Sequence, residues 1–400
     1  MRDNIIEKPF RLTFLDEPYV SDFFLQTIEE LKIAVVQTPK SLDLGRGRSL
    51  VYTSELQVVS QMEIPNGQLL YTHSENSIGW IEKNIGETDY YATIQYFKNK
   101  VLFRDLLREL YPDFFYTTVK LSELGSVDVA KIRKPFVIKP SVGFLSLGVI
   151  GINNDLDWEK AMPQIISDSE RVKKYFPASV VDSSTLIIEE YIKGEEYASD
   201  CYFDAMGNPV VLSIFKHVFA SGDDVSDRVY TTSVEIVKDT LPAIESFLIK
   251  LGKKTGLKNF PLHLEVRIAD DHSIMPIEVN PARFGGWCTT ADMAPYSYGF
   301  NPYEYYFNQI KPEWSEILAN KDSDLYSIIV LDNRTGIDGA DIKSFDYKKL
   351  AGQFENPLEI REVDFSKHPL FGFMYLKTRK DNFMEIERIL RSDLMDYVRV

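Results

Sequence analysis

One stretch of the sequence, residues 263–286 (HLEVRIADDHSIMPIEVNPARFGG), constrains the fold more than any other. Its two apolar runs are separated by a polar turn at 270–273, a pattern that predicts a β-hairpin. If the loop has two or four residues centred between positions 271 and 272, Glu265 lies directly opposite Glu278 and both side chains leave the same face. One extra loop residue would shift the register and put the two acids on opposite faces.

Opposed carboxylates need a positive partner, because cross-strand Cβ atoms lie only ~5 Å apart and like charges repel. The same register puts Arg267 and Asn280 on the face of the two acids, with His263 opposite Asn280. Mg²⁺ is usually held by one or two carboxylates together with substrate phosphates, and an Asn adds a neutral oxygen. Two interpretations stay open. Either Glu265, Glu278 and Asn280 form a Mg²⁺ site, or Arg267 alone neutralises the acids on a solvated sheet face.

A second motif, VIKPSVGFLSLGVIGI at 137–152, begins as a strand, reaches Lys139-Pro140 and continues into a loop with Gly and Ser. Uncovered backbone N–H groups near a Lys often bind phosphate. A P-loop places its Lys after the glycines and runs into a helix, whereas here Lys139 comes first and 149–152 reads as another strand. The motif therefore predicts a β-loop-β lid over an anion, with an ordinary turn as the alternative.

The rest of the chain divides into an α/β part and a β-rich part. Short apolar runs alternate with helical patterns over the first hundred residues, which is typical of a small parallel α/β domain, and no GxGxxG indicates dinucleotide binding there. One amphipathic helix is expected at 94–110, with Lys98 and Lys100 near its start. From Pro135 the pattern is β-rich. Further strands are expected at 10–15, 33–36, 68–71, 327–331 and 371–376, and further helices at 20–31, 158–175, 241–251 and 382–394.

The charge of the chain limits its partners. It has 45 basic and 60 acidic residues, a formal net charge of −15, and no local block of Lys or Arg. Duplex nucleic acid and anionic membranes reward clustered positive charge, so neither is expected to bind. Two cysteines, Cys201 and Cys288, are too few for a disulfide framework. Since the sequence shows no signal-peptide pattern and no membrane-spanning run, we expect a cytoplasmic protein.

The order of these motifs resembles the ATP-grasp superfamily: Lys139 with its Gly-rich loop, then Glu265, then the pair Glu278-x-Asn280. EVNPARFGG resembles the metal-binding strand and substrate loop of its carboxylate–amine ligases, of the L-amino-acid or peptide type. The resemblance runs from about Phe97 to Tyr306. It implies a mixed α/β and α+β fold, the ATP-grasp fold, with a Rossmann-like parallel N-terminal domain, a β-rich lid and a central antiparallel sheet. The implied domains are an N-terminal α/β domain at 1–110, a lid subdomain at 111–192, a central subdomain with the metal site at 193–318 and a small C-terminal α+β appendage at 319–400.

The resemblance implies a site for ATP and for one or two Mg²⁺, with Mn²⁺ as a substitute. The residues expected to contact phosphate are Lys100, Lys139, Ser141, Gly143 and Ser146. The residues expected at adenine are Glu189 through its side chain and Glu190 and Ile192 through their backbones. Glu196 is expected to bind the ribose, because a diol presents two donors to one carboxylate. The alternative is that this glutamate-rich strand only has one wet face.

The implied chemistry needs no protein nucleophile. A substrate carboxylate attacks the γ-phosphorus of ATP to give an acyl phosphate, and an amine then displaces phosphate. Arg283, Arg267 and Lys139 are expected to stabilise developing charge. Arg283 stands one residue later than in members with Asn-x-Arg. The loop at 141–148, with its apolar Phe144-Leu145 tip, is expected to exclude water.

Two other functions stay open. One is a different ATP-grasp reaction, carboxylation or phosphotransfer, although no biotin-attachment segment is visible. The other is a nucleotide-binding regulatory module without turnover, against which the intact ligand set argues. The expected partners are a small-molecule carboxylate and amine, with a homodimer also compatible. For His217, a core or surface role is an equal alternative to a site at the triphosphate.

Overall fold

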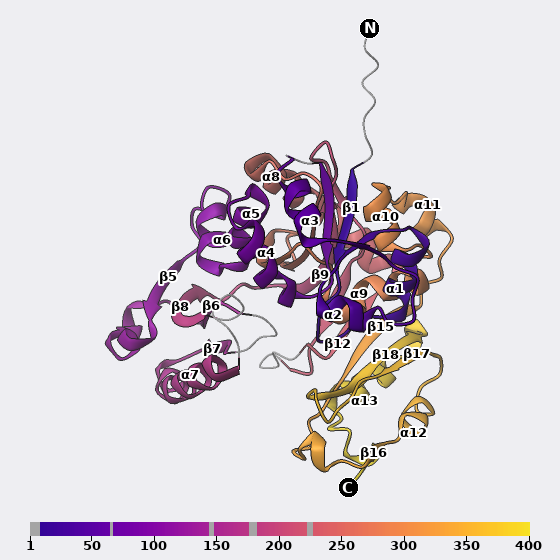
Figure 1. The fold of residues 1–400 in the computed structure, drawn as a ribbon. Coiled ribbons are helices and arrows are strands. Elements are labelled where there is room, and N and C mark those ends of the chain that lie inside the picture. Colours follow the sequence, from indigo (N-terminus) through magenta and orange to yellow (C-terminus); the bar gives the residue numbers. More distant parts are fainter. Residues whose placement is uncertain (1–8, 65–66, 144–147, 176–181, 222–226) are drawn as a thin grey trace.

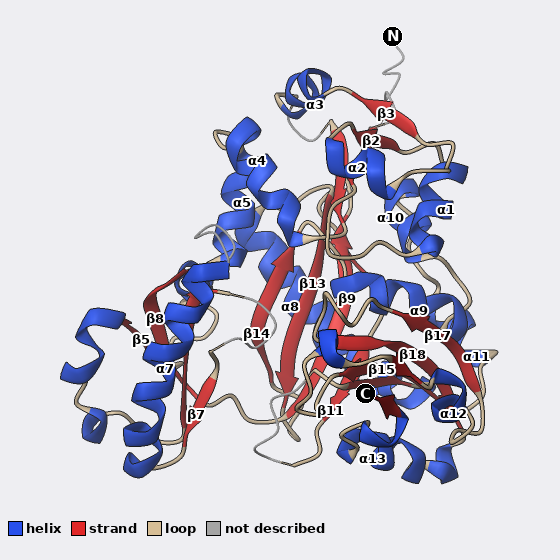
Figure 2. Ribbon diagram, turned by 60° about the horizontal axis from the view of Figure 1, so that its bottom comes forward, coloured by secondary structure: helices blue, strands red, loops and turns tan. Residues whose placement is uncertain are grey.

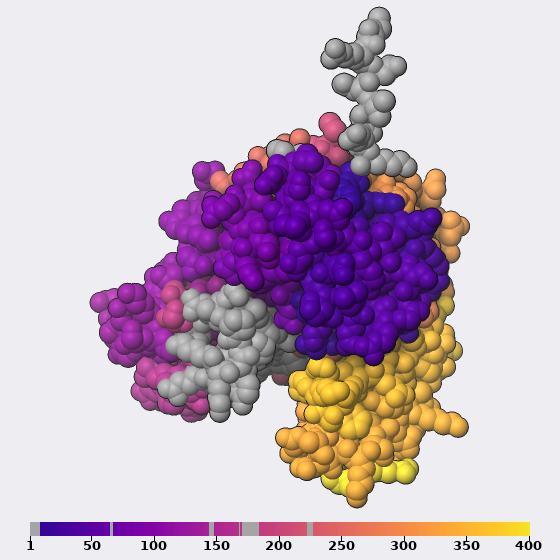
Figure 3. Space-filling model, in the orientation of Figure 1, coloured from indigo at the N-terminus to yellow at the C-terminus, as the bar shows by residue number. Residues whose placement is uncertain are grey.

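The structure, a computed structural model, describes residues 9–64, 67–143, 148–175, 182–221 and 227–400. Figure 1 shows the chain passing from an N-terminal α/β part (indigo) to a small lid sheet at one side and on to a C-terminal part (yellow). In the space-filling view of Figure 3 the lid and the C-terminal part project as two lobes from the body of the molecule. No helix in the described ranges combines the length and apolar character needed to cross a bilayer.

The N-terminal part is a four-stranded parallel sheet covered by helices. Its strands, in sheet order, are β3 (Val51–Thr53), β2 (Ala34–Val36), β1 (Phe10–Phe14) and β4 (Gln68–Thr72). Its helices are α1 (Asp22–Glu30), α2 (Pro39–Leu44), α3 (Glu55–Met62) and α4 (Ile78–Ile85). β2 and β4 are buried along their whole length, as expected for parallel strands between helices. The predicted parallel α/β unit is confirmed.

The lid is a four-stranded antiparallel sheet with one long helix, α7 (Asp155–Tyr175), on it. Its strands, in sheet order, are β5 (Tyr116–Lys120), β8 (Asp182–Glu190), β6 (Phe136–Val142) and β7 (Ile150–Ile152). Its core joins Phe136 and Ile138 of β6 to Trp158 and Ile165 of α7. β6 pairs with β7, so the predicted strand–loop–strand is confirmed. Phe144, Leu145 and Ser146 of the connecting loop lie outside the described residues.

A large antiparallel sheet forms the centre of the molecule, with its longest strands side by side in Figure 2. The strands, in order, are β14 (Ile274–Pro281), β13 (Phe260–Ile268), β9 (Glu195–Phe203), β11 (Phe215–Val218), β12 (Val229–Thr232), β15 (Leu325–Asp332), β18 (Leu370–Thr378) and β17 (Pro357–Glu362), with β10 (Pro209–Val211) beside β9. The remaining elements are α8 (Val234–Thr255), α9 (Thr289–Ser297), α10 (Pro302–Asn308), α11 (Trp314–Ala319), α12 (Tyr347–Ala351), α13 (Met384–Arg391) and the pair β16 (Ser344–Phe345) and β19 (Val398–Arg399).

The C-terminal strands are joined to the centre through this sheet. β15 pairs with β12 over four residues, and β18 and β17 follow outward. The last eighty residues therefore contribute strands to the main sheet. The domain boundaries themselves stay a prediction.

The helix expected at 94–110 is in fact two helices, α5 (Asp89–Lys98) and α6 (Lys100–Leu107). Asn99 between them is extended, with φ −89° and ψ 110°, and its side chain accepts from the N–H groups of Val101 at 2.9 Å and Leu102 at 3.3 Å. An Asn that caps a helix start satisfies N–H groups that have no partner within the helix. The break puts Lys100 at the first position of α6.

Gly194 lies in the turn that joins the lid sheet to the main sheet, and its conformation requires glycine. Its φ is +113°, and a Cβ would lie 2.4 Å from the carbonyl oxygen of Ile268. Gly256, which ends α8 with φ +68°, has open space around its Cβ position. Gly256→Ala is expected to lower the unfolding free energy only by the cost of a left-handed backbone at a residue with a Cβ, about 1–2 kcal/mol.

We expect Gly194→Ala to destabilise the protein more than Gly256→Ala, because it adds a clash with the β13 backbone to the strained φ. Urea denaturation of the two variants and the wild type measures the difference in unfolding free energy. Equal losses in the two variants would contradict the assigned close approach.

Candidate active site

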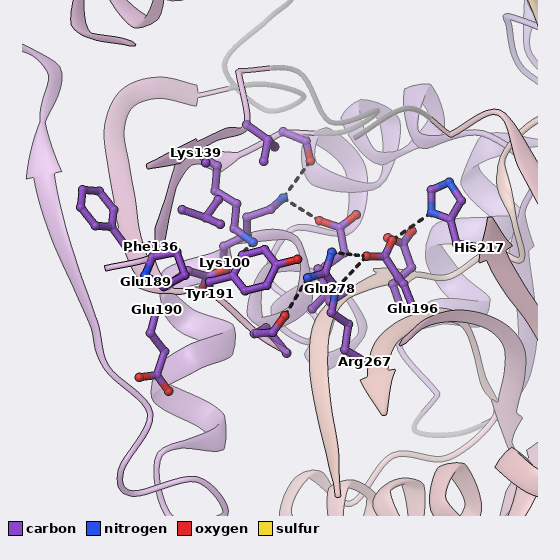
Figure 4. A pocket seen from close by; sticks show the side chains of 18 of the residues that line it. Lys100, Phe136, Lys139, Glu189, Glu190, Tyr191, Glu196, His217, Arg267 and Glu278 are labelled. Atoms are coloured by element: carbon purple, nitrogen blue, oxygen red, sulfur yellow. Dashed lines mark hydrogen bonds and ion pairs between the residues drawn. The ribbon is translucent and has the colours of Figure 1, made fainter. Parts of the chain in front are cut away.

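A cavity of about 500 Å³ lies where the lid sheet faces the ends of β13 and β14 (Figure 4). This volume is within the range of small-molecule sites. Ten residues expected from the sequence line it: Lys100, Lys139, Gly143, Glu189, Glu190, Ile192, Glu196, Glu265, Arg267 and Glu278. Three other described candidates, Ser141, Asn280 and Arg283, lie outside its lining, and Ser146 lies outside the described residues.

The β13–β14 hairpin places Glu265 opposite Glu278, and His263 opposite Asn280, as predicted. The reason differs from the expected one. Ile268 pairs with Ile274 and the loop has three residues, 270–272, so the expected loop of two or four residues is wrong. A β-bulge at Ile277, between the pairs Val266–Pro276 and Glu265–Glu278, inserts one residue and restores the register.

The two acids and Asn280 form a donor set that fits a hard divalent cation. The Asn280 Nδ2 lies 3.3 Å from Glu265 Oε1 and 3.5 Å from Glu278 Oε1. Turning the amide over would direct its oxygen to the same point. In the described part of the chain no group of three or more His, Cys, Asp or Glu side chains is arranged to hold a metal. Two carboxylates with an amide oxygen suit Mg²⁺ that also takes phosphate oxygens and water.

The acids are unequally compensated. Lys100 Nζ lies 2.9 Å from Glu278 Oε2 and 3.2 Å from the carbonyl oxygen of Gly143. Burial raises the pKa of Glu278, but Lys100 and Lys139 outweigh burial and hold that pKa below its ordinary value. For Glu265, burial and then the neighbouring Glu278 raise the pKa well above its ordinary value. Glu265 is therefore the acid that gains most from an added cation.

Lys139 shares a buried carboxylate with a residue that the sequence analysis did not single out, Arg104. Lys139 Nζ lies 2.5 Å from Glu189 Oε1, and Arg104 Nε lies 2.7 Å from Glu189 Oε2. Burial raises the pKa of Glu189, but Arg104 and Lys139 outweigh it and lower that pKa to about 2. Burial lowers the pKa of Lys139, and Glu189 only partly offsets this. The signal for Arg104 was its position four residues after Lys100, on the same helical face.

At the other end of the cavity Glu196 is held between His217 and Arg267 (Figure 4). His217 Nδ1 lies 3.0 Å from Glu196 Oε1, and Arg267 donates to Glu196 Oε2 through Nε at 3.1 Å and Nη2 at 3.0 Å. Arg267 also donates to the carbonyl oxygen of Ile192 at 2.7 Å. The structure thus commits the Arg267 guanidinium to the Glu196 end of the cavity, and its expected part in catalysis stays a prediction.

Arg283 forms a buried cluster with Glu75 and Lys98, which join it to the N-terminal domain. Arg283 Nη2 lies 2.6 Å from Glu75 Oε1, and Lys98 Nζ pairs with Glu75 Oε2. Burial raises the pKa of Glu75, but Lys98 and Arg283 outweigh it and lower that pKa to about 2. The Arg283 Nε is buried and has no hydrogen-bond partner among the described residues. The sequence carried no signal for Glu75, because it lies 208 residues from its partner.

Asp227 is a further acid that lines the cavity and that sequence reasoning missed. It accepts a hydrogen bond from the Tyr230 hydroxyl at 2.8 Å. Burial raises the pKa of Asp227, and His217 only partly offsets this. The acidic side of the cavity therefore includes Asp227 as well as the hairpin acids.

Comparison with known proteins assigns this architecture. Residues 132–291 match the family model of the ATP-grasp domain. No curated protein matches the sequence. L-amino acid ligase from Bacillus licheniformis has a similar structure, with a TM-score of 0.67, 19% identity and 98% of each chain covered. Carboxyaminoimidazole ribonucleotide synthase from Aspergillus clavatus, in complex with ATP, gives 0.62 at 15% identity over 98% of this chain and 100% of that chain.

Biotin carboxylase from Campylobacter jejuni is also similar, with a TM-score of 0.63 and 12% identity over 98% of this chain and 91% of that chain. At identities this low the likeness establishes the fold and not the reaction. The fold is the ATP-grasp fold, as expected from the motifs. Residues 132–291 thus match an ATP-grasp domain, and the chain shares the fold of these structures over nearly its whole length.

The buried cluster of Glu189, Lys139 and Arg104 should make the stability of the protein depend on pH in the acid range. The pKa of Glu189 is about 2 in the fold against an ordinary 4.5. The stability that its ion pairs contribute is therefore complete above pH 4.5 and is lost as the pH falls through 2. Glu189→Gln leaves Lys139 and Arg104 without their shared carboxylate, so we expect a loss of about 3–5 kcal/mol at pH 7. We also expect this variant to lose less further stability than the wild type between pH 4.5 and 2.

Urea unfolding at a series of pH values measures both effects. Glu109→Gln is the control, because Glu109 is exposed and pairs with Lys254 at the surface, where such a pair contributes about 0–1 kcal/mol. A Glu189→Gln variant with the acid sensitivity of the wild type would contradict the assigned role of the cluster.

Proposed function

We propose that the protein is an ATP-dependent carboxylate–amine ligase that activates a carboxylate as an acyl phosphate, joins it to an amine and releases ADP and phosphate. The observation that carries this proposal is the Glu265–Glu278 pair, which faces a cavity that also contains Lys100 and Lys139. Two opposed acids beside two lysines suit a triphosphate with its cation. The acids would bind the cation, and the lysines would bind phosphate oxygens.

The nucleotide base would lie against the connection between β8 and β9. The Ile192 carbonyl already accepts from Arg267, which leaves its N–H for a ring nitrogen. Each Glu189 oxygen has one charged partner and keeps a second lone pair, so contact with the adenine amino group is compatible with its ion pairs. Glu196 is oriented by His217 and Arg267 before a ribose arrives.

Glu265, Glu278 and Asn280 would hold Mg²⁺, which when bound supplies positive charge at the phosphoryl group being transferred. Lys100, beside Glu278, and Lys139, beside Glu189, would neutralise phosphate oxygens. Alignment of the carboxylate and the γ-phosphorus then lowers the barrier without a protein nucleophile. The roles of these residues rest on their positions in the cavity and on the resemblance of their motifs.

Arg283 is the residue best suited to the second step. Its ion pair with Glu75 fixes the side chain, and its positive charge, which also acts on Glu265, would stabilise the oxyanion that forms as the amine attacks. Gly285 and Gly286 follow in the same loop, and the Gly285 N–H is held by Asp200 at 2.8 Å. A donor that is fixed before reaction stabilises the transition state without reorganising.

We infer that the carboxylate and the amine belong to amino acids or short peptides. Support comes from the EVNPARFGG loop and from the fold shared with an L-amino acid ligase over nearly the whole chain. A biotin carboxylase and a ribonucleotide synthase have the same fold, so the fold does not identify the substrate. The substrate must be found by experiment.

The test is phosphate release from Mg-ATP across a panel of amino acids, offered singly and in pairs. We expect release that requires one amine–carboxylate combination, with ADP and a condensed product by mass spectrometry. Glu278→Gln is expected to lower the rate by at least about 100-fold, because it removes a charged ligand worth several kcal/mol to the transition state.

Glu304→Gln, which changes an exposed acid on α10, is the control and should retain the wild-type rate. ATP binding without phosphate release for any pair would contradict the ligase and favour a nucleotide-binding module. Release that requires bicarbonate would favour a carboxylation.

A further inference from the structure

Arg104 is almost fully buried and makes three charged or polar contacts outside its own helix. Its Nε lies 2.7 Å from Glu189 Oε2, while Nη1 and Nη2 donate to the carbonyl oxygens of Pro276 at 2.7 Å and Ile277 at 3.1 Å. The ring of Phe114 lies under the guanidinium, 4.8 Å away. Arg104 thus links α6 to the lid strand β8 and to β14, the strand that carries Glu278 and Asn280.

The two carbonyls that Arg104 binds belong to the bulge. In a regular strand consecutive carbonyls point to opposite edges, whereas a bulge changes this alternation. β14 is the outermost strand of its sheet, so carbonyls on its free edge have no neighbouring strand to bond. One planar guanidinium takes both Pro276 and Ile277, which a single-point cation cannot do with the same geometry.

The bulge in turn sets the metal site. Without the residue inserted at Ile277, the register given by the three-residue loop would place Ile277 and not Glu278 opposite Glu265. Lys100, one turn before Arg104 on α6, binds the side chain of Glu278 at 2.9 Å. One face of α6 therefore holds β14 at two places, the bulge backbone and the acid that follows it.

We propose that Arg104 is a positioning residue for the metal site: it stabilises the β14 bulge and so keeps Glu278 opposite Glu265. This inference rests on the proposed function, in which these two acids hold Mg²⁺. Arg104 touches neither substrate nor metal in this role. It acts through the backbone of the strand that carries a ligand.

The variant that separates this role from simple charge pairing is Arg104→Lys. A lysine keeps a positive charge for Glu189, but it lacks the two fixed nitrogens with which a guanidinium donates to two carbonyl oxygens. The readout is the gain in ADP affinity when Mn²⁺ is added, measured by calorimetry with metal and with EDTA. We expect Arg104→Lys to bind metal-free ADP as the wild type does and to lose about ten-fold in the Mn²⁺-dependent gain, the size typical of losing support behind a metal ligand.

Tyr111→Phe is the matched control. The Tyr111 hydroxyl donates to the carbonyl oxygen of Ile274 at 2.9 Å, on the same strand but away from the bulge. Its loss weakens the contact of β14 with the helices without touching the bulge, so the Mn²⁺-dependent gain should stay at the wild-type value. A thermal unfolding scan of each variant accompanies the binding measurement.

A wild-type gain in Arg104→Lys would overturn the proposal, and so would an equal loss in Tyr111→Phe. Loss of a cooperative unfolding transition in Arg104→Lys would reduce the residue to general support of the fold, which also overturns it. Failure of the wild type itself to bind ADP would contradict the proposed function instead, so the two failures are distinct.

Discussion

Glu265 and Glu278 are held opposite each other although their charges repel, and the rest of the site is arranged around that constraint. The hairpin brings the two side chains to one face, and Asn280 lies within 3.5 Å of both. Lys100 offsets the charge of Glu278, while the pKa of Glu265 is raised by burial and by its neighbour. A divalent cation between them would remove the repulsion that folding has to overcome.

The pairing of these acids was predictable from the sequence, but its cause was not. Alternating apolar residues around a polar turn fix the hairpin, and the pairing of Glu265 with Glu278 followed from an assumed even loop. The loop has three residues, and the bulge at Ile277 compensates for it. Neither departure has a local signal, because a bulge is stabilised by groups from outside the strand. The helix expected at 94–110 failed for a similar reason, since Asn99 reads as a tolerable helix residue and acts as a cap.

The positive charges of the site are fixed by partners far away in the sequence. Arg104 reaches Glu189 across 85 residues, and Arg283 reaches Glu75 across 208. Motif resemblance singled out Glu189 and Arg283 but gave no indication of the residues that hold them. Tertiary ion pairs of this kind depend on how the lid, the N-terminal sheet and the main sheet meet. The parallel N-terminal unit and the strand–loop–strand of the lid could be predicted because each depends on local periodicity.

The most direct test of the metal site is a crystal structure with Mn²⁺ and a non-hydrolysable ATP analogue, with data collected at the manganese absorption edge. We expect an anomalous peak between the carboxylates of Glu265 and Glu278, with the triphosphate beside Lys100 and Lys139. An analogue bound in the cavity with its manganese away from these two acids would contradict the assigned metal site. Nucleotide bound elsewhere in the molecule would contradict the assignment of the cavity itself.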